Sequence, residues 1–153
     1  MDYKIMQVNY SPDLKGTSLI NEPMDVVILD SGYKSYDFEK EIFEKNGIAL
    51  RIFPGYTGDF DEKMRFAENA DGILVRHTSI NDTFLGGMKN LKAVVRYGVG
   101  YDNVDVEACT RHGVKAANVQ GYANQSVSDH SLALIFSCIR GMWNTRSQLT
   151  GGF

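Results

Sequence analysis

The chain has 153 residues, of which 43% are hydrophobic and 23% charged, and its formal net charge is −3. This length suits one domain with a normal core, and the composition is that of an ordinary globular protein. The weak negative charge provides no basic field, which argues against a nucleic-acid partner. No apolar run approaches the length of a membrane span, so we expect no membrane partner.

Cysteine and histidine are too few and too scattered to predict a disulfide framework or a metal centre. The two cysteines, Cys109 and Cys138, are far apart in sequence, and both fall in predicted helices. The three histidines show no metal-ligand spacing. We therefore expect reduced thiols, a cytoplasmic protein and no metal site.

In chain order, short apolar runs alternate with amphipathic segments after a mixed stretch of 24 residues, which we interpret as an extension of unknown role. The predicted strands cover residues 26–29, 48–53, 72–75, 93–97 and 114–119. The predicted helices between them cover residues 36–45, 59–69, 82–88 and 106–112. This alternation predicts an α/β fold, a parallel sheet with helices on both faces. Five strands with these connections favour the flavodoxin-like order 2-1-3-4-5.

The last predicted helix, from about residue 126 to 148, is apolar on nearly every side. A helix that covers one sheet keeps a polar face toward water. At about 1.5 Å per residue this helix would also extend roughly 35 Å, which is longer than the strands. We therefore expect it to be buried on more than one side, by further residues of the same polypeptide or by a second subunit.

The end of the fourth predicted strand carries the clearest candidate site. The strand runs into Gly98, Val99 and Gly100, and two glycines one residue apart permit positive φ angles and expose backbone N–H groups. Ligands of open α/β sheets lie at this end of the strands, so main-chain donors here could hold a small anion or a cofactor edge. A tight strand-to-helix turn explains the same glycines equally well.

The segment LKAVVRYGVGYDNVDVEACTRHGVKAANVQGYANQSVSDHSLALIFSCIRG resembles the end of the substrate-binding domain of the D-isomer-specific 2-hydroxyacid dehydrogenases, which include D-3-phosphoglycerate dehydrogenase. The resemblance covers about residues 70–143 and rests on the R-x-G-x-G-x-D-N-V-D motif and on the asparagine motif that follows. It implies a two-domain enzyme that transfers a hydride between NAD and a 2-hydroxy or 2-oxo acid. It also implies a flavodoxin-like first domain and a dimer, so the final helix would cross into a dimerising Rossmann domain.

The resemblance assigns possible roles to individual residues. Arg76 and His77 match positions near the acidic groups of the substrate, where an arginine can bind a carboxylate or phosphate bidentately. The amides of residues 98–100 match the loop that binds the substrate carboxylate, and Val99 also matches a contact to the nicotinamide. Asn124 matches an asparagine that lines the substrate pocket in some members. The structural alternatives are a surface arginine for Arg76 and a helix N-cap for Asn124.

Asp30, at the end of the first strand, offers a different interpretation, the phosphate site of a receiver domain. That site needs a second aspartate at the end of the third strand, where this chain has Arg76. We therefore do not favour it.

The Rossmann fingerprint G-x-G-x-x-G, which the family carries after the long helix, does not occur in the sequence. The loop at 98–100 does not supply it, because Asn103 stands where the third glycine would be. In the family, the catalytic Arg, Glu and His belong to the second domain or follow it, so we assign no catalytic residue and expect no tight cofactor binding.

Two hypotheses follow for the chain. It is either the substrate-binding part of a truncated dehydrogenase or a stand-alone module that dimerises through its final helix. We divide it into an extension (1–24), a substrate-binding domain (25–124), and a linking helix with a tail (125–153).

Overall fold

The computed structural model describes residues 23–55 and 58–150. The chain forms two compact units that divide between Gln120 and Gly121. The expected N-terminal extension lies almost entirely outside the described residues.

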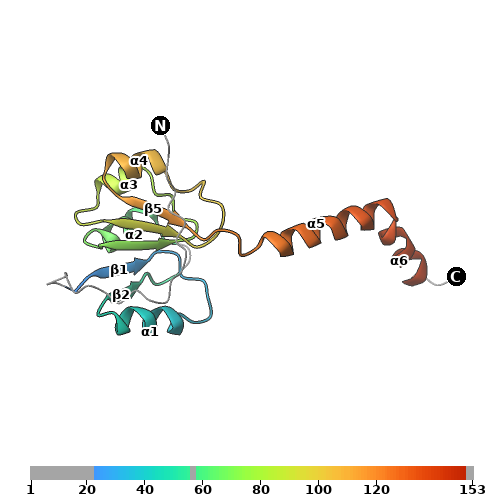
Figure 1. The fold of residues 1–153 in the computed structure, drawn as a ribbon, viewed down its shortest axis with the longest axis horizontal. Coiled ribbons are helices and arrows are strands. Elements are labelled where there is room, and N and C mark those ends of the chain that lie inside the picture. Colours follow the sequence, from blue (N-terminus) through green and yellow to red (C-terminus); the bar gives the residue numbers. More distant parts are fainter. Residues whose placement is uncertain (1–22, 56–57, 151–153) are drawn as a thin grey trace. The chain divides into compact units, whose positions relative to one another are not determined.

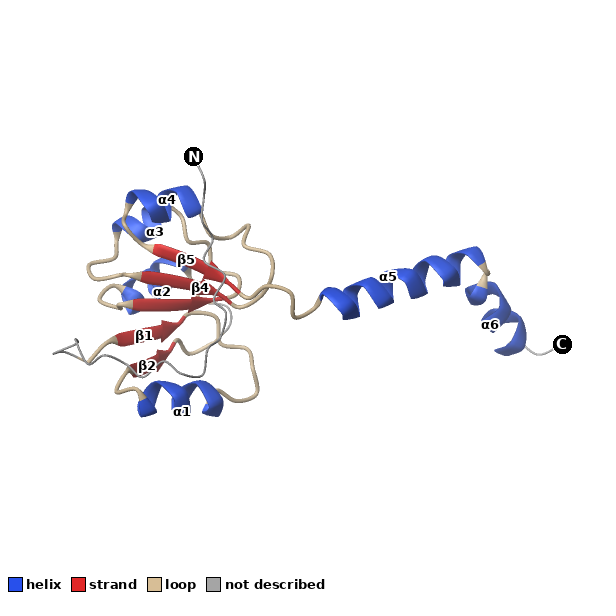
Figure 2. Ribbon diagram, in the orientation of Figure 1, coloured by secondary structure: helices blue, strands red, loops and turns tan. Residues whose placement is uncertain are grey.

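The first unit is built on a five-stranded parallel sheet (Figures 1 and 2). Its strands are β1 (Asp25–Ile28), β2 (Ala49–Ile52), β3 (Gly72–Val75), β4 (Ala93–Arg96) and β5 (Lys115–Asn118). Their order is β2-β1-β3-β4-β5, which confirms the predicted flavodoxin-like arrangement. The chain direction across the sheet reverses between β1 and β3, which makes the ends of these two strands the topological switch point.

Four helices connect the strands: α1 (Asp37–Lys45), α2 (Phe60–Ala67), α3 (Asp82–Gly86) and α4 (Val106–Arg111). Side-chain oxygens cap three of them, since Asp59, Asn81 and Asp105 each accept a hydrogen bond from a backbone N–H of the first turn. Gly113, with φ of +71°, follows the end of α4 as predicted. The four helices predicted between the strands are one to three residues too long in total.

The core lies between one face of the sheet and three of the helices. Alternate strand residues such as Val27, Leu29 and Ile73 point into it, as the two-residue period of a strand requires. Phe84 of α3 and Cys109 of α4 pack against them, and both are at most 1% exposed. This packing fixes the strands and therefore the positions of the loops that follow them.

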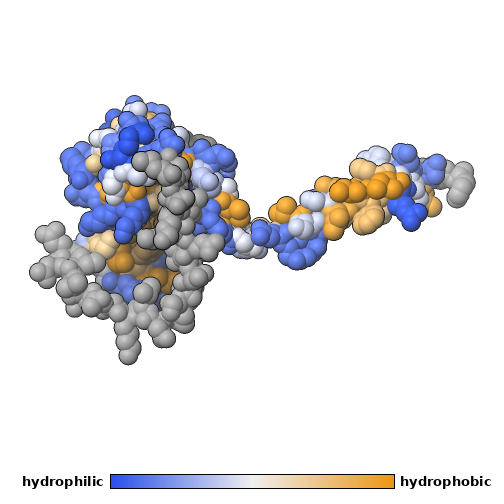
Figure 3. Space-filling view, turned by 45° about the horizontal axis from the view of Figure 1, so that its top comes forward, coloured by the Kyte–Doolittle hydropathy of each residue, from blue (hydrophilic) through white to orange (hydrophobic). Residues whose placement is uncertain are grey.

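The second unit consists of α5 (Asn124–Ile139) and α6 (Met142–Thr150). The prediction of one continuous helix was wrong, because Gly141 adopts φ of +59° and ends α5 in the left-handed conformation that glycine favours. Apolar side chains remain exposed along both helices, seen in orange in Figure 3. No helix among the described residues is long and apolar enough to span a membrane.

Candidate anion-binding site

The predicted site residues of the first unit lie in two loops, which follow two neighbouring strands at the same edge of the sheet. Arg76 and His77 follow β3, and the glycine loop at 98–100 follows β4. β3 and β4 are paired in parallel, with Val75 opposite Arg96, so both loops begin side by side. Asn124 belongs to the second unit, as the first residue of α5.

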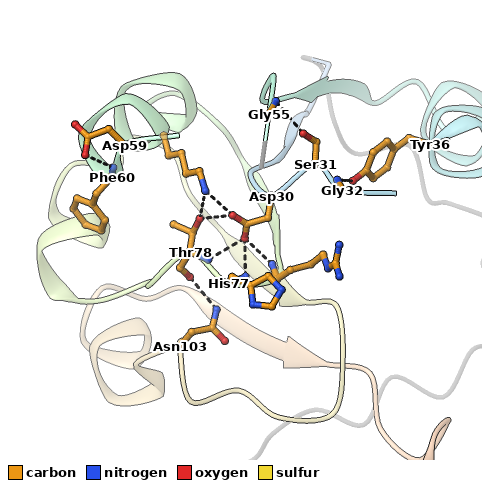
Figure 4. A network of polar contacts seen from close by, with 12 residues as sticks. Asp30, Ser31, Gly32, Tyr36, Gly55, Asp59, Phe60, His77, Thr78 and Asn103 are labelled. Atoms are coloured by element: carbon orange, nitrogen blue, oxygen red, sulfur yellow. Dashed lines mark hydrogen bonds and ion pairs between the residues drawn. The ribbon is translucent and has the colours of Figure 1, made fainter. Parts of the chain in front are cut away.

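The loop after β3 is organised by Asp30, which lies two residues after the end of β1, at the switch point (Figure 4). One carboxylate oxygen, Oδ2, accepts hydrogen bonds from three consecutive backbone N–H groups, those of residues 76–78, at 2.8, 2.8 and 2.9 Å. Converging backbone N–H groups of this kind form an anion site in many proteins. Here the anion is internal, because the Asp30 side chain is only 1% exposed.

The second oxygen of Asp30 completes a buried network with a lysine and a threonine. Oδ1 accepts from Lys63 Nζ at 2.7 Å and from Thr78 Oγ1 at 2.6 Å, and Lys63 also donates to Thr78 Oγ1 at 2.9 Å. Burial alone would raise the pKa of Asp30, but the hydrogen bonds from Lys63, Thr78 and the backbone outweigh it and hold the pKa far below its ordinary value. A buried carboxylate with five donors is not a phosphate acceptor, so the receiver-domain interpretation fails.

The loop after β4 differs, because two of its three N–H groups have no acceptor among the described residues. Gly98 adopts φ of +142°, and its N–H donates to the carbonyl of Arg96 at 2.9 Å. Within the described chain, the N–H groups of Val99 and Gly100 donate no hydrogen bond, and both residues are exposed. Of the three predicted amide donors, two are therefore available to a ligand.

Arg96 lies at the base of this loop and was not singled out from the sequence. Its Nη1 atom lies only 1.8 Å from the point that a side-chain Cβ would occupy at Gly98, so the guanidinium fills the space that the glycine leaves. Its Nε is buried and has no hydrogen-bond partner among the residues that the structure describes. Buried polar groups without a partner are rare and costly, and a bound ligand is one explanation.

An aromatic side chain that the sequence analysis did not identify, Tyr33, contacts residues of both strand ends. The Arg76 guanidinium stacks over its ring, with Cζ 4.5 Å from the ring centroid. The Tyr97 ring packs edge-on against Tyr33 at 5.9 Å. The Tyr97 hydroxyl donates to Glu39 of α1, and burial together with the Glu39 charge raises the pKa of Tyr97, which stays protonated.

The predicted N-cap alternative for Asn124 was wrong. The N-cap of α5 is Ala123, no side chain caps this helix end, and Asn124 is exposed at the first helical position.

The chemistry available at this edge is the binding of a small anion. Two exposed N–H groups, at Val99 and Gly100, lie in the loop whose base holds the Arg96 guanidinium. Carboxylates and phosphates bind to such combinations of backbone N–H and guanidinium donors. In residues 23–55 and 58–150, no group of three or more His, Cys, Asp or Glu side chains is arranged to hold a metal ion.

The fold is a doubly wound α/β domain of the flavodoxin-like type, with a candidate anion site at the carboxyl ends of its strands. The chain belongs to the D-isomer specific 2-hydroxyacid dehydrogenase family, whose catalytic-domain model matches residues 26–150.

Similar proteins agree with this assignment. A D-3-phosphoglycerate dehydrogenase from Archaeoglobus fulgidus is 31% identical over 101 residues, which cover 65% of this chain and 19% of that protein. The fold resembles an acyclic imino acid reductase in complex with NADPH and D-Arg, at a TM-score of 0.75 and 21% identity, covering 85% of this chain and 42% of that one. It also resembles the NAD+-bound 3-phosphoglycerate dehydrogenase of Entamoeba histolytica, at a TM-score of 0.65 and 24% identity, covering 76% and 39%. The chain spans less than half the length of each.

Proposed function

We propose that this chain is the substrate-binding part of an NAD-dependent D-2-hydroxyacid dehydrogenase, and that its β4 loop binds the carboxylate of a 2-hydroxy or 2-oxo acid. The observation that carries the proposal is the pair of N–H groups at Val99 and Gly100, which donate no hydrogen bond within the described chain. The Arg96 guanidinium lies beside Gly98 in the same loop, and its Nε has no partner among the described residues. These donors match the acceptor pattern of a carboxylate. Membership of the family supplies the substrate class.

Arg76 and His77 form the second part of the proposed site and contact a further acidic or polar group of the substrate. The Arg76 guanidinium stacks on Tyr33, which restrains its plane, and a guanidinium can bind a carboxylate or phosphate bidentately. Asn124 is included because it matches the asparagine of the family's substrate pocket.

NAD is the hydride carrier in this proposal, and Val99 contacts its nicotinamide ring. One structurally similar protein contains NAD+ and another contains NADPH. The sequence has no G-x-G-x-x-G fingerprint. We therefore assign tight cofactor binding and acid–base catalysis to the part of the relatives that this chain does not span, and expect no hydride transfer from these 153 residues alone.

Titration of the ¹⁵N-labelled chain with sodium pyruvate, followed by NMR, tests the site. We expect the amide signals of Val99 and Gly100 to shift in a saturable way. The variant Arg96→Met is expected to weaken pyruvate binding at least tenfold, because a charge-assisted hydrogen bond contributes about 1.5–3 kcal/mol. Arg65→Met, which removes an exposed arginine of α2, is the matched control and should change binding less than twofold. Unshifted Val99 and Gly100 signals at saturating pyruvate would contradict the proposal.

The second unit favours a further role, self-association through its helices. Nine large apolar side chains of α5 and α6 are at least half exposed: Val127, Leu132, Leu134, Ile135, Phe136, Ile139, Met142, Trp143 and Leu149. Contiguous apolar surface of this kind is rarely left in water. We propose that the chain forms a homodimer through it, whether as part of a dehydrogenase or as a stand-alone interaction module derived from the family.

Light scattering on the chain at micromolar concentration decides this point. We expect a dimer, and we expect Ile139→Glu to produce a monomer, because Ile139 is 72% exposed and a charge there opposes apolar burial. Ser131→Glu, on the same helix, is the control for added charge. A wild-type monomer would contradict self-association.

The two cysteines support the expected cytoplasmic location. Cys109 is buried, Cys138 is exposed, and both are free thiols. Free thiols persist where the surroundings are reducing.

A further inference from the structure

A continuous chain of hydrogen bonds joins the two loops of the proposed site through Thr78. The backbone N–H and the hydroxyl of Thr78 both donate to Asp30, at 2.9 and 2.6 Å. Its carbonyl accepts from the Asn103 side-chain amide at 2.9 Å. Figure 4 shows Thr78 between Asp30 and Asn103, with a dashed contact to each.

Asn103 connects this network to the glycine loop. It lies three residues after Gly100, inside a turn that the Val104 N–H closes by donating to the Tyr101 carbonyl at 2.8 Å. The Asn103 backbone carbonyl also accepts from the Ile80 N–H at 2.8 Å, so side chain and backbone both hold the segment after β4 against the segment after β3. Residues 80 and 104 form an isolated parallel bridge that extends this pairing beyond the strands.

The position of Asp30 explains why such a connection matters. In an open α/β sheet the switch point is where a ligand is expected to lie, and the N–H groups of residues 76–78 converge there. Asp30 occupies these donors itself, so they are closed to an external anion. The carboxylate thereby fixes the backbone from which Arg76 and His77 project, and it leaves the β4 loop as the open backbone site.

We propose that Asp30 and Asn103 are positioning residues. They hold the loop of Arg76 and His77 in a fixed position relative to the loop of residues 98–100, so that both loops can bind one substrate molecule. This inference rests on the proposed function. Neither residue has to contact the ligand, because Asp30 acts through the backbone of residues 76–78 and Asn103 acts through the carbonyl of Thr78. This fixed arrangement would let donors from two strand ends bind one molecule. Donors that are already in place bind more tightly than donors that must be ordered on binding.

The test uses the full 153-residue chain, labelled with ¹⁵N, and the variants Asp30→Asn and Asn103→Ala. Asparagine keeps the shape of Asp30, but its NH₂ group is a donor and must face either Lys63 or the backbone N–H groups. The hydrogen bonds on that side of the network are therefore lost. Asp71→Asn is the matched control, because Asp71 also accepts from a backbone N–H and a lysine but stands before β3, at the opposite edge of the sheet.

Two measurements are made on each variant. The first needs no ligand: we expect Asp30→Asn and Asn103→Ala each to shift the amide signals of residues 98–100, and Asp71→Asn to leave them in place. The second is the pyruvate titration, in which each of the two variants should bind at least fivefold more weakly. Because Asp30 and Asn103 both bind Thr78, the double variant should lose much less than the product of the two single losses.

The outcomes separate this inference from the proposed function. If wild-type chain does not bind pyruvate, the proposed function fails, and the ligand-free shifts still decide whether the loops are coupled. Unchanged signals for residues 98–100 in a folded Asn103→Ala variant would overturn the positioning role. So would wild-type affinity in both variants. If Asp30→Asn does not fold, Asn103→Ala alone decides.

Discussion

The loops that follow β3 and β4 start from paired strands and hold their backbone N–H groups in contrasting ways. After β3, three consecutive N–H groups are bound by the buried carboxylate of Asp30. After β4, no side chain of the described residues accepts from Val99 or Gly100, and the loop depends on the conformation of a glycine. The first loop is thus a completed anion site, whereas the second keeps two N–H groups for the ligand that we propose. The comparison shows that backbone N–H groups at the end of a strand become a structural element when the protein itself supplies the anion.

The largest expected effect comes from removing the internal anion. Asp30→Ala should destabilise the chain by about 3–5 kcal/mol, the usual cost of breaking a buried ion pair from one side. Adding Lys63→Met would restore stability if the pair were only an ion pair. We expect it not to, because the N–H groups of residues 76–78 still lack their acceptor, and each such group costs about 1–3 kcal/mol.

Urea denaturation of the two variants measures this difference. The control is Asp25→Ala, which removes the ion pair between Asp25, at the start of β1, and Arg51 of β2, where both side chains are partly exposed. Such pairs contribute about 0–1 kcal/mol. Recovery of wild-type stability in the double variant would mean that the backbone donors find water or another acceptor without cost, and the contrast between the loops would lose its energetic basis.

The next largest effect concerns the glycine of the open loop. Gly98→Ala should cost about 1–3 kcal/mol, because φ of +142° strains any residue with a Cβ and because that Cβ would overlap the Arg96 guanidinium. Gly100→Ala is the matched control, since its Cβ would meet only Asp102 Oδ2 at an ordinary 3.4 Å. Thermal unfolding compares the two. Equal losses would show that the loop relaxes easily and that its geometry is not fixed by Gly98.

The fold could be predicted almost completely from the sequence, because it depends on local periodicity. Apolar runs of four to six residues alternate with amphipathic segments, and this alternation indicates five parallel strands whose connections favour one strand order. Residues such as Asp105 and Gly113 mark helix ends. The break between α5 and α6 was missed, because a single glycine, Gly141, within an apolar run is compatible with a continuing helix and with a left-handed cap.

The candidate site could be predicted only in part. The glycine loop and Arg76 carry their signal in adjacent residues, so motif and strand position were enough. The Asp30–Lys63 pair joins residues 33 positions apart, and no short-range pattern encodes it. The stacking of Arg76 on Tyr33 and the approach of Arg96 to Gly98 likewise depend on how separate segments fold together, which the sequence pattern does not specify.

The smallest expected effect tests the aromatic contact between the two loops. Tyr97 directly precedes Gly98, packs against Tyr33 beside Arg76, and donates from its hydroxyl to Glu39 at 3.2 Å. Tyr97→Phe keeps the ring contact and removes one hydrogen bond to a charged group, so urea denaturation should show a loss of about 1–2 kcal/mol. Tyr101→Phe, at an exposed tyrosine of the same loop, should change stability by less than about 0.5 kcal/mol. If both variants were equally neutral, the hydroxyl of Tyr97 would contribute nothing, and the aromatic packing alone would join the closed loop to the open one.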